Sequence, residues 1–306
     1  MEVSMTQALR KKMSGRMKHD IPYAILFLAP SLLGLTIFTL IPIVASLGLA
    51  FTDWTLLSPP QFVGLKNFRD LFADELLWVS LGNTLKYAAM IVPGSTAIAL
   101  ALALFVNREF PGVKFIRLFF MLPGVASLVS IAMVWRWLYN DQFGLINTGL
   151  RAVGLPAVGW LTTEQWVLPA IVIMLLWSGM GFDAIIYLAA LRNIPRHLYE
   201  AAELDGANSW QSFWRITFPL LTPVHFYNLI IGLIGSFQVF DVIYVMTQGG
   251  PGFASRVYAY HLYLQAFQRF KMGYASAMAW FLFLIIFVLT LIQWRFLGRR
   301  VEYDYV

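Results

Sequence analysis

Six apolar segments, each long enough to cross a lipid bilayer, constrain the fold of this chain more than any other feature. A spanning helix needs about 20 predominantly apolar residues to cross a hydrocarbon core about 30 Å thick. The segments that meet this length are roughly Pro22–Phe51, Leu85–Val106, Arg117–Tyr139, Val167–Ala190, Val224–Met246 and Tyr274–Leu297. The sequence therefore predicts an all-α, polytopic membrane protein with six transmembrane helices, organised as one domain over residues 1–306.

The charge composition agrees with a membrane location. Charged residues make up 12% of the chain, against about 25% in soluble domains, and the mean hydropathy is +0.68. The net charge is +6, but the basic residues lie between the apolar segments and not in one patch interleaved with aromatics. We therefore expect membrane lipid around the chain and no nucleic acid partner. The absence of cysteine excludes disulfides and thiolate metal sites.

Lysines and arginines near the segment ends predict the orientation in the membrane. If the basic N-terminus, residues 1–20, is cytoplasmic, fourteen of these residues lie inside and six outside. The remaining two, Lys86 and Arg136, lie near outer helix ends, where long side chains reach the interface. The first apolar run is longer than that of a cleaved signal peptide, so it is predicted to be a spanning helix. Both termini and the loop 193–223 are then cytoplasmic.

The loop 193–223 is a long polar interruption between two strongly apolar segments, and its residues predict a structured unit. Pro195 suits a first helical turn, and residues 197–204 are rich in good helix formers. Gly206 follows them as a left-handed stop. The apolar residues of this first helix favour one side and predict an amphipathic helix; they are Ile194, Leu198, Ala201, Ala202 and Leu204.

A second helix is predicted directly after the stop. Asn208 or Ser209 can cap it, and it runs through Phe213 towards Pro219. An amphipathic helix pair of this kind at a membrane surface either lies on lipid or docks into a groove of a partner protein.

The order Glu-Ala-Ala, then Asp-Gly-Ala, then two prolines resembles the EAA loop of binding-protein-dependent ABC importer permeases. Residues 51–68, the Gly-Gly-Pro turn at 249–251 and Gly-Tyr-Ala at 273–275 look like the carbohydrate, maltose-type first permease branch of that family. The residues to which the resemblance gives a coupling role are Glu200, Ala201, Ala202, Asp205, Gly206, Ala207, Phe213 and Pro219.

This resemblance implies a type I ABC importer permease fold in which the loop 193–223, hereafter the coupling loop, docks on a cytoplasmic ATPase. It also implies a heterodimer with a second homologous permease subunit, two ATP-binding cassette subunits and an extracytoplasmic solute-binding protein. The complex would lie in a bacterial or archaeal cell membrane and import a carbohydrate or related polyol compound. Sugars, sugar alcohols and glycerol phosphates are not distinguished by the sequence.

Missing motifs limit the chemistry of the chain itself. It contains no glycine-rich phosphate loop of the form GxxxxGK[ST], so ATP and Mg are expected on the partner ATPase. The four histidines are scattered over different loops and segment ends, which argues against a metal site. No nucleophile stands beside a base, so the chain is not expected to be an enzyme or to hold a cofactor of its own.

The resemblance places a solute path on the third, fourth and fifth segments. Few of the corresponding positions are polar, which leaves open whether this subunit binds the solute or only walls the channel. Aromatic faces and hydroxyl or amide groups suit sugar recognition. The candidates are Gly124, Trp177, Ser178, Gly179, Gly232, Gly235, Ser236 and Gln238.

Ionisable residues within the apolar segments keep other interpretations open. Asp183 is either functional or a contact to a neighbouring helix, since an intramembrane carboxylate is costly. Arg136 is interpreted as an interface anchor in preference to a transport residue. A secondary, ion-driven transporter would use such groups together with inverted repeats; Asp183 and Asp241 support it, but no internal repeat is visible. A membrane-bound enzyme lacks a catalytic constellation.

Overall fold

The computed structural model describes residues 21–23 and 25–297. The basic segment 1–20, and Arg299 and Arg300 at the other predicted cytoplasmic end, lie outside the described residues. Within the described part, four helices are long and apolar enough to cross a membrane, and two bent helix pairs raise the number to six. The four are Ile21–Leu49, Glu75–Asn107, Glu164–Asn193 and Met272–Phe296. The predicted all-α, polytopic fold is confirmed, but two spans differ in shape from the prediction.

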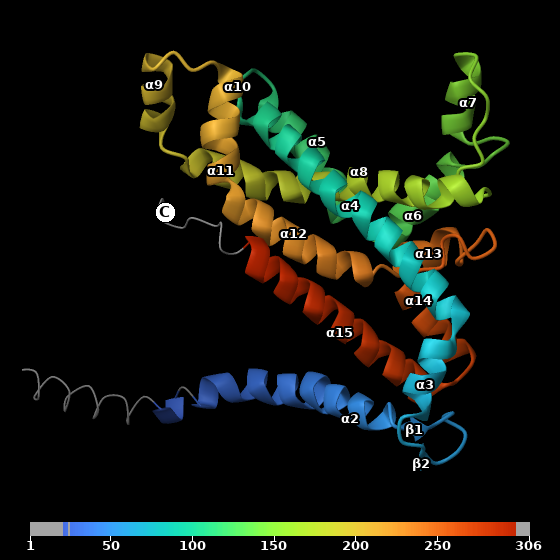
Figure 1. The fold of residues 1–306 in the computed structure, drawn as a ribbon. Helices are drawn as coiled ribbons and strands as arrows, with labels where there is room; N and C mark the ends of the chain where they lie inside the picture. Colours follow the sequence, from blue (N-terminus) through green and yellow to red (C-terminus); the bar gives the residue numbers. More distant parts are fainter. Residues whose placement is uncertain (1–20, 24, 298–306) are drawn as a thin grey trace, which may run out of the picture.

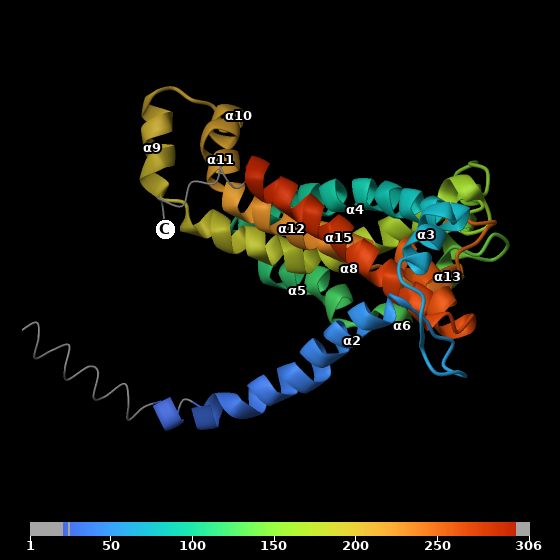
Figure 2. The same ribbon diagram turned by 60° about the horizontal axis from the view of Figure 1, so that its bottom comes forward.

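Most of the first helix stands apart from the bundle, which it meets only near its C-terminal end (Figures 1 and 2). It contains the π-helical turn η1 (Thr36–Leu40) and ends in α2 (Ile41–Leu49). The π turn ends two residues before Pro42, and the backbone N–H of Ile41 donates to the Thr36 carbonyl. Since proline has no N–H to continue the α-helical pattern, a π turn at this point is physically reasonable. Most side chains of this helix are exposed.

The centre of the bundle is formed by α4 (Glu75–Asn107) and α8 (Glu164–Asn193), which pack along each other. The helix α5 (Val113–Val125) lies against α8. At this crossing a Cβ on Gly181 would stand 2.1 Å from the Phe120 carbonyl oxygen, so only glycine allows the two backbones to approach this closely. The helix α15 (Met272–Leu297) packs on α12 (Thr222–Phe237) and on α2.

The third predicted span, Arg117–Tyr139, is not one straight helix. It is divided into α5 and α6 (Leu128–Leu138), which meet at 98°. Pro123 lies near the end of α5, and Ala126 and Ser127 then take extended conformations. Because proline removes an N–H and crowds the preceding turn, the helix stops soon after it.

The fifth predicted span, Val224–Met246, is also shorter than predicted. Its helix α12 ends at Phe237, and a separate short helix, α13 (Asp241–Met246), follows. The break falls where Gln238 and Phe240 leave helical geometry. Three polar residues, Ser236, Gln238 and Asp241, lie around this break, but the prediction took the whole apolar run as one span.

Short elements cover one end of the molecule. Asn67 joins two of them, because its amide Nδ2 donates to the Ala50 and Thr52 carbonyls at 2.9 and 2.8 Å. The two strands pair antiparallel, with Thr52 opposite Phe62. These elements are β1 (Thr52–Asp53), β2 (Gln61–Phe62), α3 (Lys66–Ala73), α7 (Leu145–Ala152), α13, α14 (Tyr258–Tyr263) and η3 (Leu264–Gln268).

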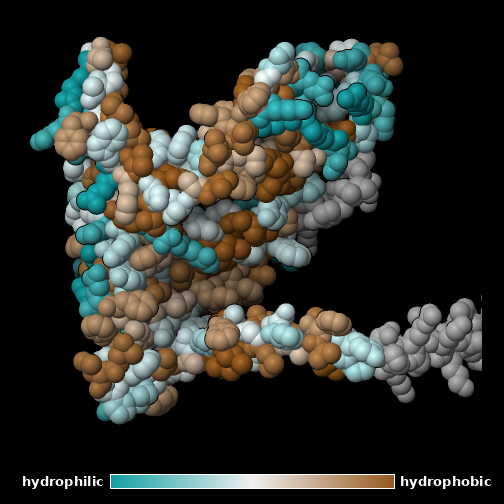
Figure 3. Space-filling view, turned by 180° about the vertical axis from the view of Figure 1, so that it is seen from behind, coloured by the Kyte–Doolittle hydropathy of each residue, from teal (hydrophilic) through white to brown (hydrophobic). Residues whose placement is uncertain are grey.

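The coupling loop projects from the opposite end (Figure 1). The start of the first helix and the end of α15 lie at that same end in both ribbon views. In Figure 3 the projecting part is largely hydrophilic, whereas a hydrophobic band covers much of the helices beside it. The helices of this loop are α9 (Arg196–Leu204), α10 (Ser209–Ser212), η2 (Phe213–Thr217) and α11 (Phe218–Leu220).

Candidate functional site

The first helix of the coupling loop ends as its sequence predicts. Gly206 has a φ of +79°, a conformation that costs an L-residue with a side chain about 1–2 kcal/mol. The N–H of Ala207 bonds the Ala202 carbonyl at 2.9 Å, and the N–H of Gly206 bonds the Glu203 carbonyl at 3.0 Å. This pair of bonds is a Schellman stop. Pro195 differs from the prediction: it is the N-cap of α9 and not a residue of its first turn.

The second helix begins at a complete capping box. The Asn208 carboxamide oxygen accepts from the Gln211 N–H at 2.9 Å, and the Gln211 side chain accepts from the Asn208 N–H at 2.9 Å. Two otherwise unpaired N–H groups are satisfied in this way. Of the two predicted caps, Asn208 and not Ser209 takes the role. The helix continues through Phe213 and past Pro219 to Leu220, as predicted.

The two helices are tied to each other and to the bundle. Tyr199 on α9 hydrogen-bonds Thr217 on η2, with 2.8 Å between the two hydroxyl oxygens. Apolar side chains on the inner side of both helices pack on the ends of α8 and α12; they include Leu198, Phe213, Ile216 and Leu220, packed against Leu188, Leu191, Ile194 and Leu221. The coupling loop is therefore anchored on the ends of α8 and α12.

The outer side of the coupling loop is exposed and carries both charged and apolar groups. Glu200, Ala201, Asp205 and Gly206 are all exposed. Leu204, predicted to lie on the apolar side of α9 together with Leu198, is 90% exposed, whereas Leu198 packs against the bundle.

The sequence prediction did not include the tryptophans of the second helix. Trp210 is 69% exposed and Trp214 is 47% exposed. Their rings lie 5.7 Å apart, and both contact the ring of Phe213. The spacing of 210, 213 and 214 places all three on one helix face, a pattern that could have identified them. Tryptophan is enriched at the energetically important centres of protein interfaces.

A central cavity of about 360 Å³ lies between α4, α5, α6, α8 and α12. Six of the eight predicted solute-path residues line it, and they come from three different helices. The six are Gly124, Ser178, Gly179, Gly232, Gly235 and Ser236. The structure thus brings together positions that are more than a hundred residues apart in the sequence.

The other two predicted path residues do not line the central cavity. The Trp177 ring is turned to Trp135 on α6, with 5.5 Å between the ring centroids. Gln238 caps the end of α12 and is exposed. Among the lining residues that were not predicted for the path, three carry polar side chains: Tyr87 and Ser95 on α4, and Asp183 on α8.

Polar groups are few on the cavity wall. Ser178 donates to the Leu175 carbonyl at 3.1 Å and Ser236 to the Leu233 carbonyl at 2.7 Å. Each hydroxyl oxygen keeps acceptor capacity towards the cavity. Asp183 has no hydrogen bond or ion pair to any other residue in the described part of the chain, so its carboxyl is available to a molecule in the cavity.

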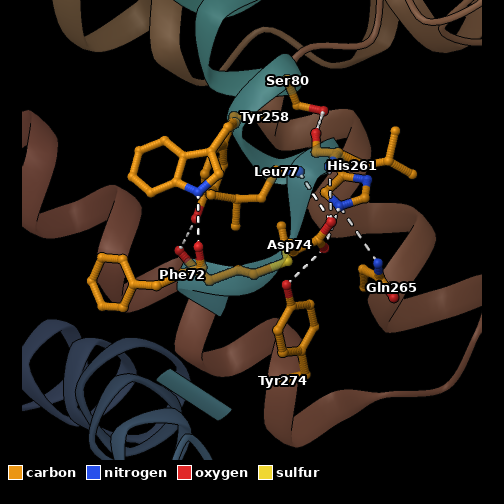
Figure 4. A network of polar contacts seen from close by, with 11 residues as sticks. Phe72, Asp74, Leu77, Ser80, Tyr258, His261, Gln265 and Tyr274 are labelled. Carbon is orange, nitrogen blue, oxygen red and sulfur yellow. Dashed lines mark hydrogen bonds and ion pairs between the residues drawn. The ribbon is translucent and has the colours of Figure 1, made fainter. Parts of the chain in front are cut away.

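A polar network holds the end of the molecule opposite the coupling loop (Figure 4). Asp74 caps α4 by accepting from the Leu76 N–H at 2.9 Å. Its other oxygen accepts from the Tyr274 hydroxyl at 2.8 Å and lies 3.3 Å from His261 Nε2. Gln265 Nε2 approaches the same ring at 3.5 Å. Elements nearly two hundred residues apart are joined here.

The titration of this network follows from its surroundings. Partial burial raises the pKa of Asp74, but hydrogen bonds from Tyr274 and His261 outweigh burial, so the net pKa lies below the ordinary value. Burial lowers the pKa of His261, and the nearby Arg256 and Arg269 add to this; the Asp74 carboxylate opposes them only in part. His261 is therefore mainly neutral near pH 7.

Arg136 and Lys86 lie towards this same end of the molecule. Arg136, in the last turn of α6, donates from Nη1 to the Val245 carbonyl at 3.3 Å. Lys86 lines an open cleft of about 780 Å³ together with Glu164 at the start of α8. Among the residues that the structure describes, no cluster of three or more histidine, cysteine or acidic side chains could hold a metal ion.

Comparison with known proteins places this arrangement in one family. Residues 95–303 match the family of the binding-protein-dependent transport system inner membrane component. The match spans more than half of the chain, so the chain belongs to this family. It is a multi-pass membrane protein and a permease subunit of an ABC transporter; it is not an enzyme, because separate subunits hydrolyse ATP in such transporters.

Similar proteins match almost end to end. The chain is 36% identical over 302 residues to the probable ABC transporter permease protein YesP of Bacillus subtilis, covering 97% of this chain and 96% of YesP. It is 36% identical to the probable starch degradation products transport system permease protein AmyD of Thermoanaerobacterium thermosulfurigenes, and 34% identical to the lactose transport system permease protein LacF of Rhizobium radiobacter. Each of these two matches covers 88% of this chain and 91% of the relative.

Solved structures agree with the fold. The crystal structure of a bacterial ABC transporter involved in the import of the acidic polysaccharide alginate matches with a TM-score of 0.82 at 27% identity, over 95% of this chain and 100% of that chain. A second structure, of the alginate ABC transporter in complex with an alginate pentasaccharide-bound periplasmic protein, matches with a TM-score of 0.79 at 27% identity, over 91% and 94%.

Proposed function

We propose that this chain is the membrane-spanning permease of an ATP-driven importer, and that its coupling loop carries the movement of a cytoplasmic ATPase into the bundle. The observation that carries the proposal is that the loop is exposed on one face and packed on the bundle with the other. It projects from the bundle with an exposed outer face, while its inner face is packed on the ends of α8 and α12. A unit that is rigid, anchored and exposed suits the transmission of force between two proteins.

Local bonds make the loop stiff enough for this role. Three local features fix the loop: the Schellman stop at Gly206 ends the first helix, and the capping box at Asn208 begins the second. The bond between Tyr199 and Thr217 holds the two helices together. Trp210 and Leu204 supply the apolar anchor of a contact, and Glu200 supplies charge at its rim. Closure of the ATPase pair would then move α8 and α12 as one body and open the central cavity alternately to each side.

The solute is proposed to be a carbohydrate or a related polyol compound. The names of AmyD and LacF refer to starch degradation products and to lactose, and the two similar solved structures are of a transporter for alginate. The central cavity offers serine acceptors, Tyr87 and the carboxyl of Asp183, which suit hydroxyl groups. We assign the solute path to the six predicted residues that line the cavity.

The remaining partners are proposed from the same arrangement. The first helix leaves its apolar side chains uncovered along nearly its full length, which suits packing against a second homologous permease. Two ATP-binding cassette subunits, carrying ATP and Mg, and an extracytoplasmic solute-binding protein would complete the importer. We place the complex in a bacterial or archaeal cell membrane, with both termini and the coupling loop cytoplasmic.

A substitution in the coupling loop tests the proposal. In the complete complex, Gly206→Val forces a β-branched residue to a φ of +79° and distorts the stop; we expect uptake of the solute captured by the binding protein to fall at least tenfold. Gly149→Val is the matched control, because a Cβ there meets nothing within 4 Å and the residue lies in α7, away from the loop. Uptake that continues without ATP, or equal uptake by both variants, would contradict the proposal.

A further inference from the structure

A buried hydrogen bond joins α8 to α12 between the coupling loop and the central cavity. The Tyr187 hydroxyl oxygen and His225 Nδ1 are 2.7 Å apart, and the two side chains are 0% and 8% exposed. The rings also contact, with 5.2 Å between their centroids. A polar contact sealed from water is costly to break, because neither partner can turn to solvent instead. The pair therefore fixes α8 relative to α12 at this level.

His225 connects this bond to the coupling loop. The centroid of its ring lies 4.6 Å from that of Phe218, in the last helix of the loop. The backbone N–H of His225 donates to the Leu221 carbonyl at 2.9 Å. Phe218 in turn contacts Phe213, at 6.1 Å between centroids. The chain bends by 61° between the helix ending at Leu220 and α12. His225 therefore lies just beyond the bend, where a shift of α11 first meets the membrane bundle.

The same helix faces continue to the wall of the central cavity. Asp183 precedes Tyr187 by one helical turn on α8, and Gly232 follows His225 by two turns on α12. Both Asp183 and Gly232 line the cavity. Along both helices, the bond therefore lies between the coupling loop and the residues that line the cavity.

We propose that Tyr187 and His225 are positioning residues that force α8 to follow α12 when the coupling loop moves. Without the bond, the loop still acts on the ends of both helices, but at the level of the cavity α8 no longer moves together with α12. The inference rests on the proposed function, and it adds a specific pair through which movement of the loop reaches the cavity.

The coupling can be measured without knowing the solute, by following the reactivity of a cysteine introduced into the cavity wall. The chain has no cysteine, and a Cβ at Gly235 meets nothing within 4 Å, so Gly235→Cys places one thiol in the cavity. The rate of its labelling by N-ethylmaleimide is measured in the complete complex, in cysteine-free partner subunits, with and without ATP plus vanadate. We expect nucleotide to change this rate at least fivefold in the G235C parent.

Tyr187→Phe, added to this parent, removes only the hydroxyl. We expect the labelling rates with and without nucleotide to differ by less than about twofold in this variant, while the complex still hydrolyses ATP. Tyr139→Phe is the matched control: this tyrosine is 2% exposed and donates to the Ala170 carbonyl at 2.9 Å, nearer the other end of α8. It loses an equally buried bond, so it should lower thermal stability similarly yet keep the fivefold change.

The His225→Leu variant should reduce the effect of nucleotide on the labelling rate as much as Tyr187→Phe does. The double variant should reduce it no further, because the two residues act as one unit. A Tyr187→Phe complex that keeps the full effect of nucleotide would overturn the inference, as would an equal loss in Tyr139→Phe. A parent complex whose labelling ignores nucleotide would instead refute the proposed function itself. The two failures are thereby distinguished.

Discussion

At the scale of the residue, the behaviour of this chain is set by a few side chains whose surroundings fix their chemistry. His261 and Asp74 illustrate this at the end opposite the coupling loop. Both have a pKa below the ordinary value, for Asp74 because hydrogen bonds favour its charged form and for His261 because burial disfavours its charged form. In both cases the folded state binds fewer protons than the unfolded state, so stability rises with pH.

This sign predicts that acid loosens the end of the molecule opposite the coupling loop. The contribution of His261 is present above its ordinary pKa of about 6.5 and is lost as pH falls below it; that of Asp74 is lost at still lower pH. Between pH 7.5 and 5.5 we expect hydrogen exchange of residues 258–268, corrected for the intrinsic pH effect, to become faster. His261→Gln should remove most of this change, and His197→Gln, on the exposed surface of α9, should keep it. Equal pH dependence in both variants would contradict the assignment.

At the scale of the element, helix shape depends on close approaches that composition does not reveal. The chemistry of proline, glycine and asparagine predicted the stop at Gly206 and the cap at Asn208, because both are local. The apolar pattern that located the spans did not predict that α6 turns 98° from α5. It also extended the predicted fifth span past Phe237, where α12 ends. Breaks between two apolar stretches arise from backbone geometry, so hydropathy alone does not locate them.

The crossing of α5 and α8 gives a testable case at this scale. Gly181→Ala places a Cβ 2.1 Å from the Phe120 carbonyl oxygen, so α5 must move, at a cost of about 1–3 kcal/mol for overpacking. We expect the thermal midpoint of the purified complex to fall by several degrees. Gly82→Ala, within α4, meets nothing within 4 Å and should be neutral or slightly stabilising. Similar midpoints for the two variants would show that the close approach does not limit stability.

At the scale of the whole molecule, the structure joins residues that the sequence keeps far apart. The resemblance predicted the positions of six cavity residues, but only the fold brings α5, α8 and α12 around one space. Trp177 and Gln238 were chosen for their chemistry alone, and they point elsewhere because aromatic packing and the end of α12 decide their directions. Asp74 and His261, 187 residues apart, could not be paired without the fold.

The central claim is that the exposed face of the coupling loop docks on a separate ATPase. The most direct measurement is cysteine cross-linking in the purified complete complex, which the cysteine-free chain permits. We predict that a Glu200→Cys variant is cross-linked to the ATP-binding subunit by a short bifunctional thiol reagent, and that an Arg151→Cys variant, on α7, is not. A complex that contains no ATP-binding subunit, or a Glu200→Cys thiol that reacts only from outside the cell and joins no ATPase, would contradict the claim.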